Sequence, residues 1–176
     1  MCGKISNTTT IYAAKTVKLS KTSFTYTRKY IKPSIVIKNS KGKTISSKYY
    51  TVSGTKSSKN IGKFKITIKF KGNYSGTKTL YYTINPKTVS NLKLTAGKKQ
   101  IKISYKKDSS VSGYEIKYST NKSFKKAKTL KVSSTKKTIT KLTTKKTYYV
   151  KVRAFKKVSG KTYYGAYCKT KTVKVK

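Results

Sequence analysis

The sequence predicts an all-β protein, and three features of the chain carry this prediction. Lysine alternates with β-branched and aromatic residues at period two, as in FKITIKF at residues 64–70, which is typical of strands with one buried face. Tyrosine occurs 16 times and phenylalanine five times, so large apolar side chains are available for a core. Proline occurs only twice, and turn sequences such as Gly72–Asn73 separate the alternating segments.

The charge of the chain is the main argument against a folded protein. Lysine and arginine total 45 against two acids, for a net charge of +43, and a self-repelling chain with little apolar surface normally stays disordered. The lysines are, however, interleaved with residues that favour strands and are not gathered into a tail. We therefore expect folded strands that carry the positive charge on their outer faces.

The first half of the chain contains four segments with strand character. They lie at residues 22–39, 48–54, 61–72 and 77–86. Short strands at this spacing favour a β-sandwich over residues 16–86. Pro86 cannot donate a hydrogen bond to a strand ladder and therefore marks the boundary to the second half.

The second half contains seven such segments, which favour an immunoglobulin-like sandwich over residues 87–176. They lie at residues 89–95, 99–107, 113–120, 127–133, 136–142, 147–157 and 161–176. In GYEIKYS, alternation directs Tyr114, Ile116 and Tyr118 inward, and Glu115 and Lys117 toward water. A second inward stripe consists of Tyr148, Val150, Val152 and Ala154. The chain is thus predicted to form two tandem immunoglobulin-like β-sandwiches.

The segment before the first sandwich has the composition of a strand but no clear place in the strand order. Residues 1–15 are expected to form a strand-like arm, and the stretch 4–19 either supplies the first strand of its own domain or completes a sheet of a neighbouring molecule. Cys2 and Cys168 lie near opposite ends of the chain and could form a disulfide within or between molecules. Spacing alone does not decide between a disulfide and two free thiols.

The chain offers few residues for catalysis or metal binding. Histidine is absent, and Asp108 and Glu115 are the only acids. Metal centres, carboxylate pairs and Ser-His-Asp triads therefore lack their components, and an isopeptide crosslink would need a buried carboxylate, whereas alternation points Glu115 outward. No run of 18 apolar residues is present. We predict a non-enzymatic protein with no cofactor, no metal and no membrane-spanning segment.

Motifs in the second half resemble the fibronectin type III family. In LTTKKTYYVKVRA, residues 142–154, a leucine precedes a tyrosine by six residues, and small apolar residues then alternate up to an alanine. The resemblance implies that Tyr148 is a corner tyrosine, whose hydroxyl caps a backbone group near the turn before its strand. It also implies that Tyr105 takes the place of the tryptophan of the second strand, and Tyr167–Cys168 that of a Trp-Ser pair near the last strand.

Motifs in the first half are similar to a small immunoglobulin-like repeat of bacterial surface proteins. YTRKYIKP (26–33), YYTVSGTKSSKNIG (49–62) and GNYSGTKTLYYTINP (72–86) correspond to its early, middle and closing signatures. Residues 87–176 likewise resemble the lysine-rich fibronectin type III domains of Gram-positive surface proteins. These resemblances imply a secreted, extracellular or cell-surface location, while both families are defined by architecture and neither fixes a function.

A positive charge with almost no balancing acid suggests that the protein binds an anionic polymer. Lysines could merely solvate the outer strand faces and discourage edge pairing. Without acids, however, lysines on adjacent strands are expected to oppose each other, at roughly several tenths of a kcal/mol per facing pair. Teichoic acid, an acidic polysaccharide or nucleic acid would relieve that repulsion. The predicted binding residues are Lys65, Lys69, Lys71, Lys102, Lys117, Lys151 and Arg153.

Such binding would be diffuse and steeply dependent on salt. Arg28 and Arg153 are the only arginines, and lysine lacks the planar fork that reads guanine, so recognition is expected to be independent of nucleotide sequence. Exposed tyrosines could stack on bases or sugar rings. The alternative function is a structural subunit of an extracellular fibre that self-associates by strand or edge pairing.

Overall fold

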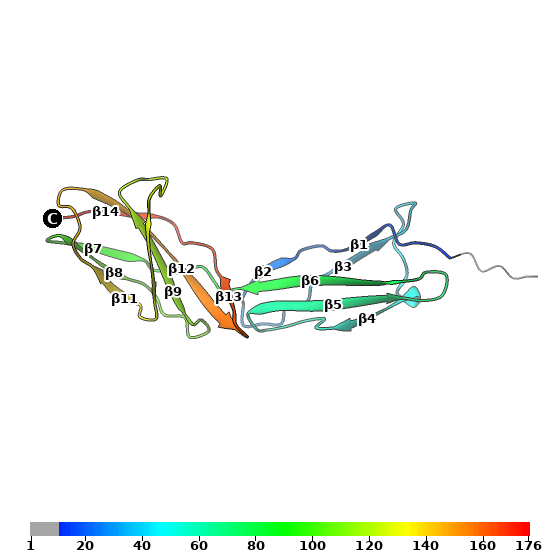
Figure 1. Cartoon of the computed structure of the whole chain (residues 1–176). Helices are drawn as coiled ribbons and strands as arrows, with labels where there is room; N and C mark the ends of the chain where they lie inside the picture. The colour runs from blue at the N-terminus through cyan, green and yellow to red at the C-terminus, as the bar shows by residue number, and fades with distance from the viewer. Residues whose placement is uncertain (1–10) are drawn as a thin grey trace, which may run out of the picture. The chain divides into compact units, whose positions relative to one another are not determined.

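The computed structural model describes residues 11–176, which form β-strands and one short 3-10 turn (Figure 1). No α-helix occurs in this part of the chain, so the predicted all-β class is confirmed. The chain divides into two compact units. Unit 1 comprises the described residues up to Phe24 together with residues 28–84, and unit 2 comprises residues 25–27 and 85–176.

Unit 1 contains a two-stranded and a four-stranded antiparallel sheet. The smaller sheet pairs β1 (Thr16–Leu19) with β3 (Ile35–Lys38). The larger sheet has the order β2-β6-β5-β4, with β2 (Ser23–Thr25), β6 (Thr77–Asn85), β5 (Gly62–Phe70) and β4 (Tyr50–Gly54). The 3-10 turn η1 (Ser47–Tyr49) leads directly into β4.

The core of unit 1 follows from the alternation in β5 and β6. On β5, Ile66, Ile68 and Phe70 are buried, while the lysines between them are exposed. Tyr82 and Ile84 on β6 are fully buried. Leu19 and Ile37 of the smaller sheet are buried as well. Removing these side chains from water stabilises the unit and fixes which face of β5 carries its charge.

Unit 2 contains a three-stranded and a five-stranded sheet. The first has the order β11-β8-β7, with β11 (Lys136–Ile139), β8 (Gln100–Ser104) and β7 (Lys93–Gly97). The second has the order β10-β9-β12-β13, with β10 (Lys128–Val132), β9 (Gly113–Ser119), β12 (Thr147–Val158) and β13 (Lys161–Tyr164). A further strand, β14 (Lys171–Lys174), pairs with the first four residues of β12.

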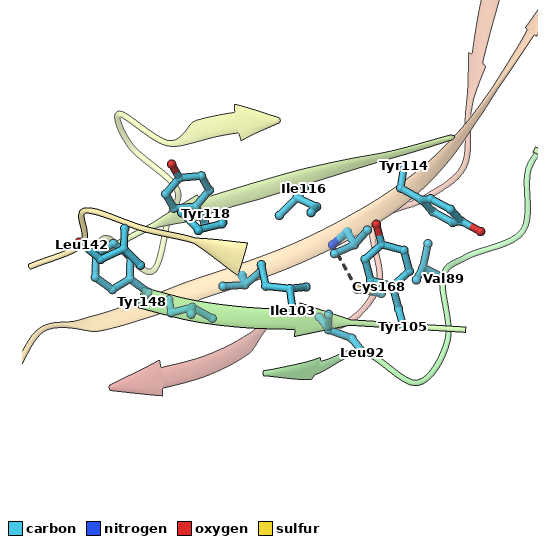
Figure 2. Close-up of a cluster of buried hydrophobic side chains, with 14 of the residues drawn as sticks. Val89, Leu92, Ile103, Tyr105, Tyr114, Ile116, Tyr118, Leu142, Tyr148 and Cys168 are labelled. Atoms are coloured by element: carbon cyan, nitrogen blue, oxygen red, sulfur yellow. Dashed lines mark hydrogen bonds between the residues drawn. The ribbon is translucent and has the colours of Figure 1, made fainter. Parts of the chain in front are cut away.

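The core of unit 2 consists of aliphatic side chains with tyrosine rings at both ends (Figure 2). Ile103 and Ile116 are buried in its middle. Figure 2 shows Tyr118, Leu142 and Tyr148 at one end of the cluster, and Tyr105, Tyr114 and Val89 at the other. The ring centroids of Tyr105 and Tyr114 lie 4.7 Å apart. The inward stripes expected on β9 and β12 are therefore those that form the core.

Most strands lie where the sequence predicted them, and three predicted segments differ. The segment 22–39 is two strands, interrupted where Arg28 adopts a left-handed backbone with φ of 66°. The segment 89–95 is extended only from Lys93, after Asn91 turns with φ of 57°. The segment 161–176 is two strands, β13 and β14. Between them, Gly165 lies so close to Pro86 that a Cβ there would be 2.7 Å from the Pro86 carbonyl oxygen.

The predicted N-terminal arm is described only in part. Residues 1–10, which include Cys2, lie outside the described residues. Tyr12 forms a parallel bridge with Tyr74, and its backbone N–H donates to the carbonyl of Asn73 at 2.7 Å. Residues 16–19 form β1 and pair with β3, so this part of the segment supplies a strand to its own unit.

Candidate polyanion-binding surfaces

The outer face of β5 carries an exposed row of lysines, which we call the β5 lysine row: Lys63, Lys65 and Lys69. Alternation places these lysines opposite the buried isoleucines and directs them to solvent. Two of the predicted residues, Lys65 and Lys69, therefore share one face. The third, Lys71, is exposed just after β5, where its N–H donates to the carbonyl of Tyr49 at 2.9 Å.

Tyr81 on β6 adds an aromatic ring to this face. It is 48% exposed, and it pairs in register with Lys65. The ammonium group of Lys63 lies 4.4 Å from the centroid of the Tyr81 ring. Both acids of the chain belong to unit 2, so no carboxylate within unit 1 competes for these lysines. The surface offers ammonium groups, a tyrosine ring and threonine hydroxyls to an incoming polymer.

The expectation that lysines oppose each other across the sheets is wrong for nearly all of the strand pairs. On β5, Lys63 faces Thr83, Lys65 faces Tyr81, and Lys69 lies between Thr77 on β6 and Thr51 on β4. Threonine favours strands and carries no charge, so it separates the lysines without acids. Within the described strand ladders, Lys117 and Lys151 are the two lysines that face each other directly. The remaining repulsion acts over longer distances and is screened by salt.

Lys117 and Lys151 lie on the outer face of the larger sheet of unit 2, and both are partly buried. The ammonium group of Lys151 lies 4.0 Å from the centroid of the Phe124 ring and 4.8 Å from that of Tyr167. A cation is attracted to the face of an aromatic ring, and this attraction offsets part of the repulsion from Lys117. Lys151 is thus already engaged within the protein.

The prediction that Glu115 faces water is wrong, because the chain after β13 covers this face of the sheet. Glu115 is only 5% exposed. The Nε and Nη2 atoms of Arg153 each lie 2.7 Å from its Oε1, and the Tyr167 hydroxyl donates to the same oxygen at 2.5 Å. Burial, together with this hydrogen bond, raises the pKa of Tyr167 to about 12, so the hydroxyl keeps its proton and donates.

Arg153 also belongs to a stack of cations and rings on this face, which we call the cation–aromatic ladder. Its members are Lys131, Tyr164, Arg153, Tyr167, Lys151 and Phe124. The guanidinium carbon lies 4.0 Å from the ring centroid of Tyr164 and 4.6 Å from that of Tyr167. Sequence reasoning missed this ladder. The available signal was the tyrosine-rich stretch 163–167, which follows a strand with cations at alternate positions.

The seven predicted binding residues do not form one site. Three lie in unit 1, at or just beyond the β5 lysine row. Lys102 is exposed on β8, between Thr95 and Thr138 on the neighbouring strands. Lys117, Lys151 and Arg153 lie on the other sheet of unit 2, where the last two already have partners within the chain. The β5 lysine row is therefore the most available of these surfaces.

The residues that the sequence suggested as structural are all buried. The Tyr148 hydroxyl accepts a hydrogen bond from the Thr143 N–H at 3.2 Å, which is the kind of contact that the fibronectin type III resemblance implied. The Tyr105 hydroxyl donates to the carbonyl of Ser134 at 2.9 Å. Pro86 is fully buried.

Cys168 is a buried free thiol in this structure. Its sulphur accepts a hydrogen bond from the Val152 N–H at 3.3 Å, and burial raises the pKa of the thiol. Cys2 is outside the described residues, so a disulfide between the two stays a prediction.

Residues 11–176 contain neither a cluster of metal-ligating side chains nor a helix of membrane-spanning length. No group of three or more His, Cys, Asp or Glu side chains in this range could hold a metal ion. No helix there is long and apolar enough to cross a membrane.

Comparisons with known proteins place a fibronectin type III domain at residues 85–165, where the chain matches the family. A segment of two fibronectin type III domains from chicken tenascin is similar in structure, with a TM-score of 0.57 and 13% identity. The match covers 92% of this chain and 99% of the tenascin segment. The FN1–FN3 domains of chicken CNTN1 match with a TM-score of 0.47 and 16% identity, over 94% of this chain and 68% of that chain. No curated protein matches the sequence significantly.

The similarity to the tenascin segment confirms the predicted fold class of tandem β-sandwiches. The family match confirms the fibronectin type III resemblance around Tyr148. The similarity of the first half to a bacterial immunoglobulin-like repeat stays a prediction.

Proposed function

We propose that this chain, with its fibronectin type III domain at residues 85–165, is a non-enzymatic extracellular module that adheres diffusely to anionic polymers. Fibronectin type III domains are typically non-catalytic and extracellular. The observation that carries the proposal is the β5 lysine row, which is exposed in a unit without any acid. An anionic polymer is the partner that best offsets this unbalanced charge.

The geometry of β5 suits a polymer that lies along the strand. Successive outward residues on a strand are about 6.8 Å apart, so Lys63 and Lys65 are closer together than the screening length of about 8 Å at physiological salt. Neighbouring ammonium groups therefore act together on one segment of polymer. Because each is a hydrated point charge, the polymer can slide and reorient without losing the interaction.

A binding titration of three variants tests this proposal. Teichoic acid, heparin and mixed-sequence DNA are titrated at low and at physiological salt into the wild type, Lys63→Gln/Lys65→Gln/Lys69→Gln, and a matched control. The control, Lys18→Gln/Lys38→Gln/Lys43→Gln, removes the same charge from exposed positions on or beside the smaller sheet of unit 1. We expect the first variant to lose much more affinity than the control. Equal losses would assign binding to net charge alone, and no binding to any polymer at low salt would overturn the proposal.

Assembly into a fibre, the alternative function predicted from the sequence, is less well supported. It drew on strand or edge pairing between molecules, and the strand at residues 16–19 pairs with β3 of its own unit. Size-exclusion chromatography at moderate salt separates the two functions, because a dispersed monomer contradicts fibre assembly and is compatible with adhesion.

A further inference from the structure

A cavity of about 560 Å³ lies at one end of unit 2, between the loop that joins β9 to β10 and the loop that joins β11 to β12. Its volume is in the range of sites that hold a small molecule. Four lysines line it, and no acid does: Lys125, Lys126, Lys128 and Lys141. We infer that this cavity binds one unit of a polyol phosphate, such as a glycerol phosphate within a polymer. The inference rests on the proposed function and names the class of polymer.

The charge of the cavity has no counterion within the chain. Glu115 is held by Arg153 and Tyr167, and Asp108 accepts hydrogen bonds from the backbone and side chain of Ser110. Neither acid lines the cavity. Four lysines around one recess favour an anion with its charge spread over several oxygens, as in a phosphate.

A hydroxyl group in the cavity wall is available to bind the anion. The Tyr118 side chain is buried, yet its hydroxyl has no hydrogen-bond partner within residues 11–176 and is not sealed from solvent. Figure 2 shows this hydroxyl pointing away from the aliphatic side chains of the core. By contrast, the hydroxyl of the neighbouring Tyr148 is bonded to the Thr143 N–H. Tyr118 can therefore donate to a phosphate oxygen, while the exposed hydroxyls of Thr120 and Thr143 can bond those of a polyol.

Both walls of the cavity are held in place before anything binds. In the first loop, the Ser119 hydroxyl donates to the carbonyl of Lys125 at 3.1 Å and accepts from the Asn121 N–H at 3.0 Å. Lys126 and Lys141 adopt left-handed backbone conformations, with φ of 49° and 57°. Glycine would occupy such positions with less strain, so lysine side chains are displayed there at a cost in stability. Preformed walls lower the ordering cost of binding.

The lining residues favour a polyol phosphate over nucleic acid. The two aromatic residues that line the cavity, Tyr118 and Tyr148, pack their rings into the core. The cavity therefore offers no exposed ring on which a base could stack. A thin flexible chain can carry a phosphate into a recess, whereas duplex DNA presents its phosphates along a stiff rod.

The test is a nuclear magnetic resonance titration of the full chain with sn-glycerol 3-phosphate. This monomer is too short to bridge many lysines, so a saturable response reports the cavity and not diffuse adhesion. We expect shifts that saturate at the backbone amides of Tyr118, Lys126 and Leu142. Tyr118→Phe removes one hydroxyl, and Lys126→Gln/Lys141→Gln removes two charges. Because bonds to a charged group are lost, each variant should bind about tenfold more weakly.

The matched control is Lys157→Gln/Lys161→Gln, which removes two exposed charges at the far end of β12 and should change affinity less than twofold. Equal weakening in this control, or an absence of saturable shifts at the cavity, would overturn the inference. Equal binding of inorganic sulfate would overturn the assignment to a polyol phosphate. If teichoic acid binds and the monomer does not, the inference about the cavity is refuted and the proposed function is not. If the monomer binds and no polymer does, only the proposed function is refuted.

Discussion

The buried ion pair of Glu115 and Arg153 should contribute more to the stability of unit 2 than any other pair of charges described. Their side chains are 7% and 27% exposed, and Oε1 of Glu115 accepts hydrogen bonds from Arg153 and Tyr167. Removing one partner of a buried pair costs about 3 to 5 kcal/mol. Arg153→Met leaves the buried carboxylate with the Tyr167 hydroxyl as its hydrogen-bond donor among the described residues and with Lys131 on the neighbouring strand as the nearby cation. We therefore expect a loss at the lower end of that range, about 3 kcal/mol.

The reverse truncation should cost less, because the guanidinium is the more exposed partner. Glu115→Ala allows Arg153 to regain water and keep its contacts with the flanking rings, so we expect a loss of about 2 kcal/mol. The two effects should not add. The double variant should lose about 2 kcal/mol less than the sum of the single variants, because each single change already breaks the shared contact.

Urea unfolding, followed by amide signals of unit 2, measures these losses. Asp108→Asn is the matched control for Glu115→Ala, since it removes the other acid and raises the net charge equally, while its amide oxygen can still accept the local hydrogen bonds from Ser110. We expect this control to lose less than about 1 kcal/mol. Additive effects in the double variant, or a Glu115→Ala loss no larger than that of the control, would refute the reasoning.

Two substitutions and one labelling experiment probe buried polar groups. Tyr82→Phe removes a buried hydroxyl that has no hydrogen-bond partner in the described chain, so thermal unfolding should show equal or higher stability, and a loss above about 1 kcal/mol would contradict this. Tyr148→Phe removes the acceptor of the Thr143 N–H and should lose about 1 kcal/mol in urea unfolding, which an unchanged midpoint would contradict. Cys168 should resist iodoacetamide at pH 8 in the native state and react in urea, because burial and a raised pKa limit its thiolate. Peptide mapping separates it from Cys2, and rapid native labelling of Cys168 itself would contradict this.

The sequence predicted the strands and the core well, because both depend on local alternation. Wherever one face of a strand is buried, period two decides which residues form the core, as it does for Ile66 and Ile68 on β5 and for Ile116 on β9. Two of the three segments that broke the pattern do so where the backbone turns without glycine, at Arg28 and Asn91. Left-handed conformations of non-glycine residues leave no reliable signal in a single sequence.

The surroundings of the outer faces could not be predicted in the same way. Alternation correctly placed Glu115 on the face opposite the core, but it carries no information about a later segment that crosses that face. The same limit applied to Arg153 and Lys151, which were expected to be free and lie against aromatic rings. Lys65 and Lys69 were placed correctly on an exposed face, since β4 and β6 flank β5 in the sheet and no described segment covers its lysines.

If the β5 lysine row binds anionic polymers through charge, affinity must depend steeply on salt. Affinity for teichoic acid and for single-stranded DNA is measured over a series of salt concentrations, with the wild type and Lys63→Gln/Lys65→Gln/Lys69→Gln. We expect the logarithm of the association constant to fall linearly with the logarithm of the salt concentration. For DNA, the slope of the variant should be shallower by about 2, since each lysine contact contributes about 0.7. Affinity that does not change with salt, or equal slopes for the two proteins, would contradict it.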